Sequence, residues 1–250
     1  MKTKPGARRA VSHPDGAAQR EKAALRAGLQ AARLALPAEE RRRADAARTS
    51  LVLALLRDWR TEKASQAGIS ASFTGFDGCA GSAEGAFSAD GTGPHPVVAL
   101  YLSRLPEPSS LTLAAELHRA NWRLLVPAPG PSSAPWRDPA WAWYDEPLVV
   151  GPRGIPLAPG PALPPETLAE AGVIILPGLA GARDGGRLGY GGGWYDKALW
   201  HASPTAERWL LLGEDEVFDH LPEEAHDIGV SRLVTPAGVI VCLRPGGGPV

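Results

Sequence analysis

Residues 187–197 concentrate the side chains of this sequence that could do chemistry: Arg187, Leu188, Gly189, Tyr190, Gly191, Gly192, Gly193, Trp194, Tyr195, Asp196 and Lys197. Because glycine lacks a Cβ, this main chain can approach an anion closely and adopt a positive φ. Arg187 adds a guanidinium fork that suits phosphate, and Asp196 is a candidate magnesium ligand beside it. An apolar run at residues 173–176 precedes the segment. The pattern indicates a phosphate-binding loop between a strand and a helix.

Two better-known phosphate motifs do not fit this loop. The sequence contains no Gly-x-x-x-x-Gly-Lys-Ser/Thr, and Trp194 stands where the last glycine of Gly-x-Gly-x-x-Gly is required. A glycine-rich turn with a purely structural role therefore remains open on the loop alone.

A second pair of cations lies far upstream. Lys22 and Arg26 are four residues apart in a segment with helical spacing, so both project from one face of a helix. Two guanidinium or ammonium groups on one face can bind a phosphate tail, whereas a solvated basic surface is the alternative.

The elements that must position these residues follow from periodicity. Apolar runs at 97–102, 122–126, 173–176 and 209–212 predict buried strands, and residues 111–120 have helical spacing between the first two. Helical spacing on either side of Leu36-Pro37 predicts an antiparallel helix pair, and residues 233–243 predict a hairpin. We therefore expect an α/β fold with a mostly parallel sheet flanked by helices in an open, three-layer, Rossmann-like architecture. Ligands should bind beyond the carboxyl ends of its strands.

Composition limits the class of protein. The chain has 250 residues, a net charge of −1 and two cysteines, with no apolar run long enough to span a membrane. These features predict a cytoplasmic protein without a disulfide framework or membrane contact. Residues 1–50 carry 12 Lys/Arg against 5 Asp/Glu, but they lack interleaved aromatics, so we expect no nucleic-acid binding.

The expected organisation is a single domain over residues 18–244. It is preceded by a mobile tail at 1–17, interrupted by a flexible Gly/Ser/Ala-rich insertion at 66–96 and followed by a C-terminal tail at 245–250.

With these residues in place, the sequence resembles the 5-formyltetrahydrofolate cyclo-ligase (methenyltetrahydrofolate synthetase) family over about residues 20–240. The resemblance is carried by Leu176-Pro177-Gly178-Leu179 with residues 186–197, by Lys22-x-x-x-Arg26, by Tyr101-Leu102-Ser103 with Glu107, and by Leu221-Pro222-Glu223-Glu224-x-His226-Asp227 running into Val234-Thr235-Pro236.

The resemblance implies ATP-dependent closure of 5-formyltetrahydrofolate to 5,10-methenyltetrahydrofolate through a phosphorylated formyl group, with release of ADP and phosphate. It implies ATP contacts at Lys22, Arg26 and residues 187–195, magnesium ligands at Asp196 and Asp227, and a substrate site at Leu102 and Glu107. We expect Arg187 and Tyr195 to be catalytic, Trp143 to contact the substrate rings, and the protein to be a monomer. For Trp143 a core or lid role remains open.

The sequence departs from the family pattern at several positions. Gly181-Ala182 replaces a bulky residue followed by aspartate, Gly192 stands where many members have lysine, and a glutamate expected near Leu157 is absent. A noncatalytic folate- or nucleotide-binding protein, or an ATP-dependent enzyme acting on another substrate, is therefore the alternative.

Overall fold

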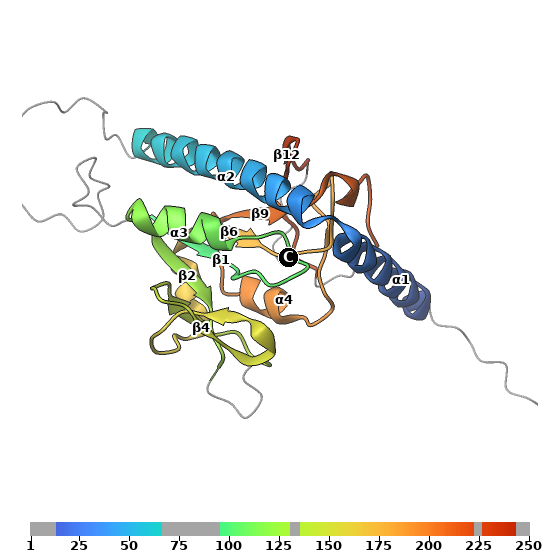
Figure 1. The fold of residues 1–250 in the computed structure, drawn as a ribbon, viewed down its shortest axis with the longest axis horizontal. Coiled ribbons are helices and arrows are strands. Elements are labelled where there is room, and N and C mark those ends of the chain that lie inside the picture. The colour runs from blue at the N-terminus through green and yellow to red at the C-terminus, as the bar shows by residue number, and fades with distance from the viewer. Residues whose placement is uncertain (1–13, 67–95, 131–135, 223–226, 244–250) are drawn as a thin grey trace, which may run out of the picture.

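The computed structural model describes residues 14–66, 96–130, 136–222 and 227–243. Its centre is a seven-stranded sheet (Figure 1). The strands are β1 (Val97–Leu100), β2 (Arg123–Pro127), β3 (Trp141–Trp143), β6 (Ala171–Leu176), β9 (Glu207–Leu211), β11 (Arg232–Thr235) and β12 (Gly238–Val241). They are ordered β12-β11-β9-β6-β1-β2-β3, with parallel inner strands and an antiparallel strand at each edge. The predicted parallel sheet and C-terminal hairpin are confirmed.

Helices cover both faces of this sheet. Helices α2 (Ala38–Gln66) and α3 (Leu111–Arg119) pack on one face, and η2 (Pro165–Glu170) and α4 (Trp194–Leu199) pack on the other. Because successive side chains of a strand point to opposite faces, Val98 and Leu100 join the α2 side while Val97 and Ala99 join the α4 side. Buried on both faces, the strands form continuous apolar runs, as the sequence pattern predicts.

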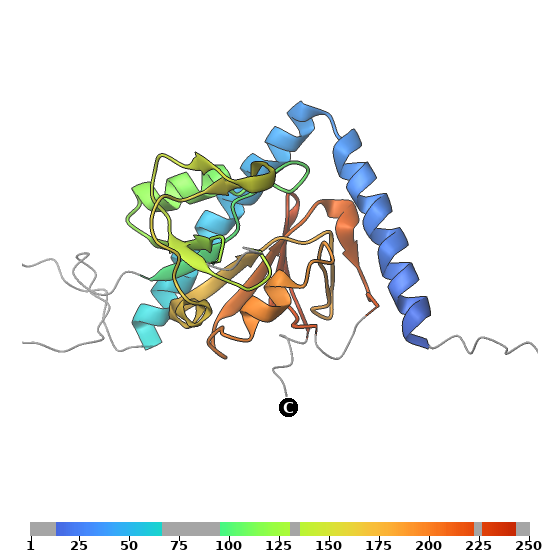
Figure 2. The ribbon, with the colours of Figure 1, turned by 90° about the horizontal axis from the view of Figure 1, so that it is seen from below.

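The N-terminal helices differ from the predicted antiparallel pair. The turn does fall at Leu36 and Pro37, but α1 (Pro14–Ala35) and α2 diverge from it, as Figure 2 shows. Helix α1 instead packs through Leu25 and Leu29 on a small second sheet, whereas α2 lies along the main sheet. Helix α1 also begins at Pro14, so residues 14–17, which were predicted to belong to the mobile tail, are helical.

The second sheet, which the sequence analysis missed, has the order β10-β7-β8. It consists of β7 (Ala180–Ala182), β8 (Arg187–Leu188) and β10 (Val217–Phe218). Strands β7 and β8 form a hairpin between β6 and α4, so the predicted strand–loop–helix connection contains two extra short strands.

The remaining segments complete the surface around the sheet. Between β2 and β6 the chain forms two short antiparallel pairings, β2 with β3 and β4 (Val149–Val150) with β5 (Pro156–Leu157). Two short 3-10 turns, η1 (Pro152–Gly154) and η3 (Glu214–Glu216), complete the described elements. The predicted insertion lies outside the described residues except at its two ends, residues 66 and 96, and the predicted tail at 245–250 lies wholly outside them. Among the helices of the described ranges, none is both long and apolar enough to cross a bilayer.

The strand order creates a switch point between β1 and β6. From β1 the chain passes through α3 to β2 on one side, and it then returns to form β6 on the other side of β1. In open α/β sheets, ligands bind outside the carboxyl ends of the strands at such a point. The residues that follow β1 and β6 are therefore the first place to look for a site.

Candidate active site

A small cavity of about 150 Å³ lies at this switch point. It brings together the segment after β1, the residue after β6, the start of α4 and the segment leading into β5. Its lining residues are Tyr101, Leu102, Arg104, Glu107, Pro127, Trp136, Ile155, Pro156, Pro177, Trp194 and Tyr195. Two residues predicted to bind the substrate, Leu102 and Glu107, thus share one cavity with Trp194 and Tyr195 of the glycine loop.

Three side chains of this small cavity carry a buried polar hydrogen that no acceptor in the described ranges receives. They are the indole N–H groups of Trp136 and Trp194 and the phenol O–H of Tyr195, which we call the donor triad. A buried donor without an acceptor costs about 1–3 kcal/mol, so native proteins rarely tolerate one without a reason. The donor triad therefore marks the small cavity as a place where a ligand can supply acceptors.

Burial shifts the pKa of two ionisable side chains that line the small cavity, Tyr195 and Glu107. Burial raises the pKa of Tyr195 well above its ordinary value, as does the nearby Glu107, while Arg187 opposes the shift. Tyr195 therefore keeps its proton at neutral pH and remains a donor. Burial also raises the pKa of Glu107, although the backbone N–H of Arg104 donates to its Oε2 at 2.9 Å and favours the charged form.

The predicted phosphate loop adopts the backbone that its glycines permit. Gly191 and Gly193 have φ of +88° and +65°, which residues with a Cβ rarely adopt. From α1, Arg26 Nε donates to the carbonyl oxygen of Gly189 at 2.9 Å, and its guanidinium also lies beside Gly191. The prediction that the α1 cations and the loop belong to one site is supported by this contact.

Both predicted metal ligands pair with cations of the predicted ATP site. Lys22 Nζ forms an ion pair with Asp227 Oδ2 at 2.9 Å, and Arg187 pairs with Asp196. Arg187 belongs to the glycine-rich segment, Arg26 contacts it, and Lys22 lies one helical turn before Arg26 on the same face of α1. These three positive charges suit a polyphosphate.

The magnesium assignment is less complete. No group of three or more His, Cys, Asp or Glu side chains within the described part of the chain is arranged to hold a metal ion. Magnesium bound partly through nucleotide phosphates needs one or two carboxylates, so Asp196 and Asp227 suit that role chemically. Each carboxylate already pairs with a cation, and their role as ligands stays a prediction.

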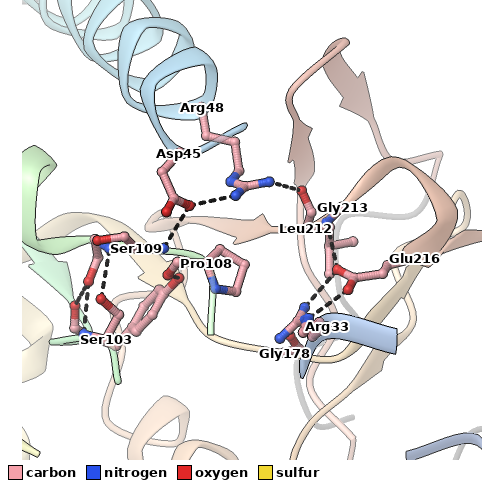
Figure 3. A network of polar contacts seen from close by, with 12 residues as sticks. Arg33, Asp45, Arg48, Ser103, Pro108, Ser109, Gly178, Leu212, Gly213 and Glu216 are labelled. Carbon is pink, nitrogen blue, oxygen red and sulfur yellow. Dashed lines mark hydrogen bonds and ion pairs between the residues drawn. The ribbon is translucent and has the colours of Figure 1, made fainter. Parts of the chain in front are cut away.

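A second, larger cavity of about 730 Å³ lies where α1, α2, the segment 103–109 and η3 meet. Figure 3 shows the polar network that surrounds it. Arg33 of α1 is buried and donates to both carboxylate oxygens of Glu216 at 2.6 and 2.7 Å, to the Gly178 carbonyl at 2.7 Å and to the Tyr190 hydroxyl at 2.8 Å. Arg48 of α2 donates to Asp45 and to the Leu212 carbonyl. These contacts fasten both helices to the carboxyl edge of the sheet.

The sequence analysis did not predict the role of Arg33. Arg33 lies in the basic segment of residues 1–50, yet it is only 3 % exposed. A signal was present, because Arg33 lies four residues after Leu29, which faces the second sheet. Its contact with Tyr190 connects α1 to the glycine loop at a point that spacing alone does not reveal.

The remaining predicted site residues lie as follows. Leu188 is buried in the second sheet, and a Cβ placed on Gly192 would meet no described atom within 4 Å. Trp143 is absent from the described linings of both cavities, and its ring lies 4.0 Å from the Arg123 guanidinium. The small cavity is lined instead by Trp136, a residue that the sequence analysis did not select.

One departure from the family pattern has a structural explanation. A Cβ on Gly181 would lie 2.6 Å from a methyl of Leu233 and 2.9 Å from methyls of Leu210 and Leu212, so a larger residue would require three leucine side chains to shift. The following Ala182 is fully buried within β7, where a carboxylate would be desolvated. The Gly181-Ala182 pair therefore suits the packing of this chain.

Comparison with known proteins agrees with this geometry. The model of the 5-formyltetrahydrofolate cyclo-ligase family matches residues 87–236. A 5-formyltetrahydrofolate cyclo-ligase of Mycolicibacterium smegmatis is 38% identical over 149 residues, which are 59% of this chain and 77% of that protein.

Two solved structures have similar folds. The 5,10-methenyltetrahydrofolate synthetase of Aquifex aeolicus is 26% identical, with a TM-score of 0.64 over 91% of this chain and 95% of that one. That of Mycoplasma pneumoniae is 16% identical, with a TM-score of 0.56 over 86% and 99%, and this likeness concerns the fold alone. The matched family residues include β1, β6, the glycine loop and Glu107, all of which meet at the switch point. From the sequence match and this arrangement together, we conclude that the chain belongs to the 5-formyltetrahydrofolate cyclo-ligase family.

Proposed function

We propose that this protein closes 5-formyltetrahydrofolate to 5,10-methenyltetrahydrofolate at the expense of ATP. The formyl oxygen attacks the γ-phosphorus of ATP and ADP leaves. The N10 nitrogen then attacks the formyl carbon, and the carbon–oxygen bond breaks with release of phosphate. The phosphate ester is needed because an amide-type oxygen is a poor leaving group.

The observation that carries this proposal is that the proposed folate contacts line the same cavity as two residues of the proposed ATP-binding loop. Leu102 and Glu107 line the same small cavity as Trp194 and Tyr195. These two aromatics belong to the glycine-rich segment whose other residues contact Arg26. A substrate in the small cavity would therefore lie beside a polyphosphate on the loop, as transfer between the two requires.

The side chains have complementary tasks in this scheme. Glu107 accepts hydrogen bonds from the N–H edge of the pterin, and Leu102 packs against its ring. Lys22, Arg26 and Arg187 bind the phosphates, and the loop glycines allow the main chain to approach them. Tyr195, kept protonated by burial, donates to oxygen as negative charge develops during the transfer.

Magnesium would be held by Asp196 and Asp227, where it would neutralise phosphate charge. Each carboxylate must then leave or share the cation that it now pairs with, Arg187 or Lys22. Asp196→Asn and Asp227→Asn should each lower magnesium-dependent turnover by orders of magnitude. Asp215→Asn, in η3 at the larger cavity, is the matched control and should leave turnover unchanged. Unaltered magnesium dependence in both test variants would remove the metal assignment.

An absorbance assay tests the activity directly. The methenyl product absorbs in the near ultraviolet, where the formyl substrate does not, so purified protein should raise this absorbance only when ATP is present. Ligand binding without any absorbance change would instead indicate a noncatalytic folate- or nucleotide-binding protein. ATP turnover that does not depend on the formyl substrate would indicate another acceptor.

A further inference from the structure

We infer that Trp136 is a specificity-determining residue of the folate site, where its indole N–H donates a hydrogen bond to an acceptor on the bound substrate. The inference rests on the proposed function, because it names a contact of the same substrate. Trp136 lies between β2 and β3, outside both the glycine loop and the segment that follows β1.

The position of Trp136 supports this role. Its side chain lines the small cavity together with Leu102, Glu107 and Tyr195, so it can contact whatever occupies the space. Its Nε1 is shielded from solvent, and no described residue offers it an acceptor. Such a donor is costly in the empty protein, and an acceptor on a ligand would remove the cost.

The balance of donors and acceptors around the small cavity describes its ligand. Glu107 is an acceptor when ionised, whereas the donor triad presents one N–H from Trp136, one N–H from Trp194 and one O–H from Tyr195. A fitting ligand is a flat heterocycle with a donor edge for the carboxylate and several oxygen or nitrogen acceptors elsewhere. A reduced pterin that carries a formyl group has both features.

The buried indole N–H groups of Trp59 and Trp141 also have no acceptor among the described residues, but neither tryptophan lines the small cavity. The combination of an unpaired N–H and a cavity position is therefore not general. Trp143 lies one strand away, where its ring contacts the Arg123 guanidinium, and it is absent from the described lining of the small cavity. Its indole nitrogen is also absent from the buried described atoms that have no partner. Trp143→Phe is therefore a matched control for Trp136→Phe, since both changes remove one indole N–H and keep an aromatic ring.

The test measures ligand affinity and stability in wild-type protein, Trp136→Phe and Trp143→Phe. Calorimetric titration with 5-formyltetrahydrofolate should show about a tenfold loss of affinity for Trp136→Phe and no change for Trp143→Phe. ATP affinity should stay the same in both, and the unfolding midpoint of Trp136→Phe should not fall, because the changed N–H of Trp136 makes no hydrogen bond to the described residues. Trp136→His, which restores a ring N–H, should recover part of the affinity.

Three outcomes would overturn the inference: unchanged folate affinity in Trp136→Phe, an equal loss for folate and ATP, or a lowered unfolding midpoint that accounts for the loss. The wild-type titration separates this failure from that of the proposed function. If wild-type protein does not bind 5-formyltetrahydrofolate, the function itself is wrong. If it binds and Trp136→Phe binds equally well, the inference about Trp136 alone is wrong.

Discussion

Arg104 and Glu107 line both cavities and form a wall between them. The two cavities differ in whether the buried donors around them have hydrogen-bond acceptors within the protein. Around the larger cavity, the buried guanidinium groups of Arg33 and Arg48 are held by carboxylates and backbone carbonyls, with the Nε of Arg48 left over. Around the small cavity, the donor triad has no acceptor in the described ranges. Size alone would favour the larger space as the active site. Hydrogen bonding favours the smaller one, because its donors still need partners.

The difference separates two kinds of residue. Polar groups that the protein itself satisfies contribute to folding, so their loss should lower stability. Polar groups that await a ligand contribute to binding or turnover, so their loss should not lower stability. This distinction can be tested by changing one group at a time on each side of the shared wall.

The largest effect should come from Arg33→Leu at the larger cavity. The change leaves Glu216 buried without its partner, which typically costs 3–5 kcal/mol of folding free energy, so denaturant unfolding should show a loss of about that size. The double variant Arg33→Leu/Glu216→Leu should recover much of it. A loss below about 1 kcal/mol in Arg33→Leu would contradict the structural role assigned to this pair.

Tyr195→Phe tests the opposite expectation at the small cavity. Removing a transition-state donor commonly lowers turnover by a hundredfold or more, so we expect a decrease of about a hundredfold in kcat for methenyl product formation. The thermal unfolding midpoint should not fall, since the Tyr195 hydroxyl has no partner among the described residues. Tyr144→Phe is the control: its hydroxyl donates to Glu146, and its loss should leave turnover intact. Equal activity of Tyr195→Phe and wild type would remove Tyr195 from the catalytic residues.

Glu107→Gln tests the role of the wall that the two cavities share. The substitution keeps the size of the side chain but replaces one acceptor with a donor, which would face N–H donors on the pterin. Losing a charge-assisted hydrogen bond costs roughly 1.5–3 kcal/mol, so folate affinity should fall about ten- to a hundredfold. ATP affinity should not change, because its proposed contacts lie on α1 and the glycine loop. A parallel loss of ATP affinity in titrations would show that Glu107 is not a pterin contact.

The smallest expected effect is on pH dependence. Because burial raises the pKa of Glu107 in the folded protein, the folded state binds this proton more tightly than the unfolded state does. The contribution of Glu107 to stability should therefore decrease as pH rises from the ordinary glutamate pKa through the raised one. Folate affinity should change in the opposite direction, since the carboxylate form accepts the pterin hydrogens. Unfolding and titration across this pH window, with Glu107→Gln as the pH-insensitive control, check both signs.

The layers of the fold and the glycine-rich character of the loop can be predicted from the sequence alone. Apolar runs such as residues 173–176 have no polar face, and their short length and β-branched residues favour strands buried on both sides. Such strands imply a parallel sheet with helices on each face. The glycines at 191 and 193 permit the positive φ that the loop adopts. The family resemblance likewise depends on residues within short segments, and the comparisons confirm it.

Which residues from distant parts of the sequence are in contact depends on tertiary packing. Periodicity could not show that α1 separates from α2 and packs on a second sheet, where Arg33 reaches Tyr190. Nor could it show that Trp136 joins Glu107 and Tyr195 at one cavity, or that Trp143 turns to Arg123 instead. The physical reason is that local pattern specifies an element and its buried face. Strand order and helix packing determine which polar atoms find partners, and three of the atoms that find none belong to side chains that line the proposed site.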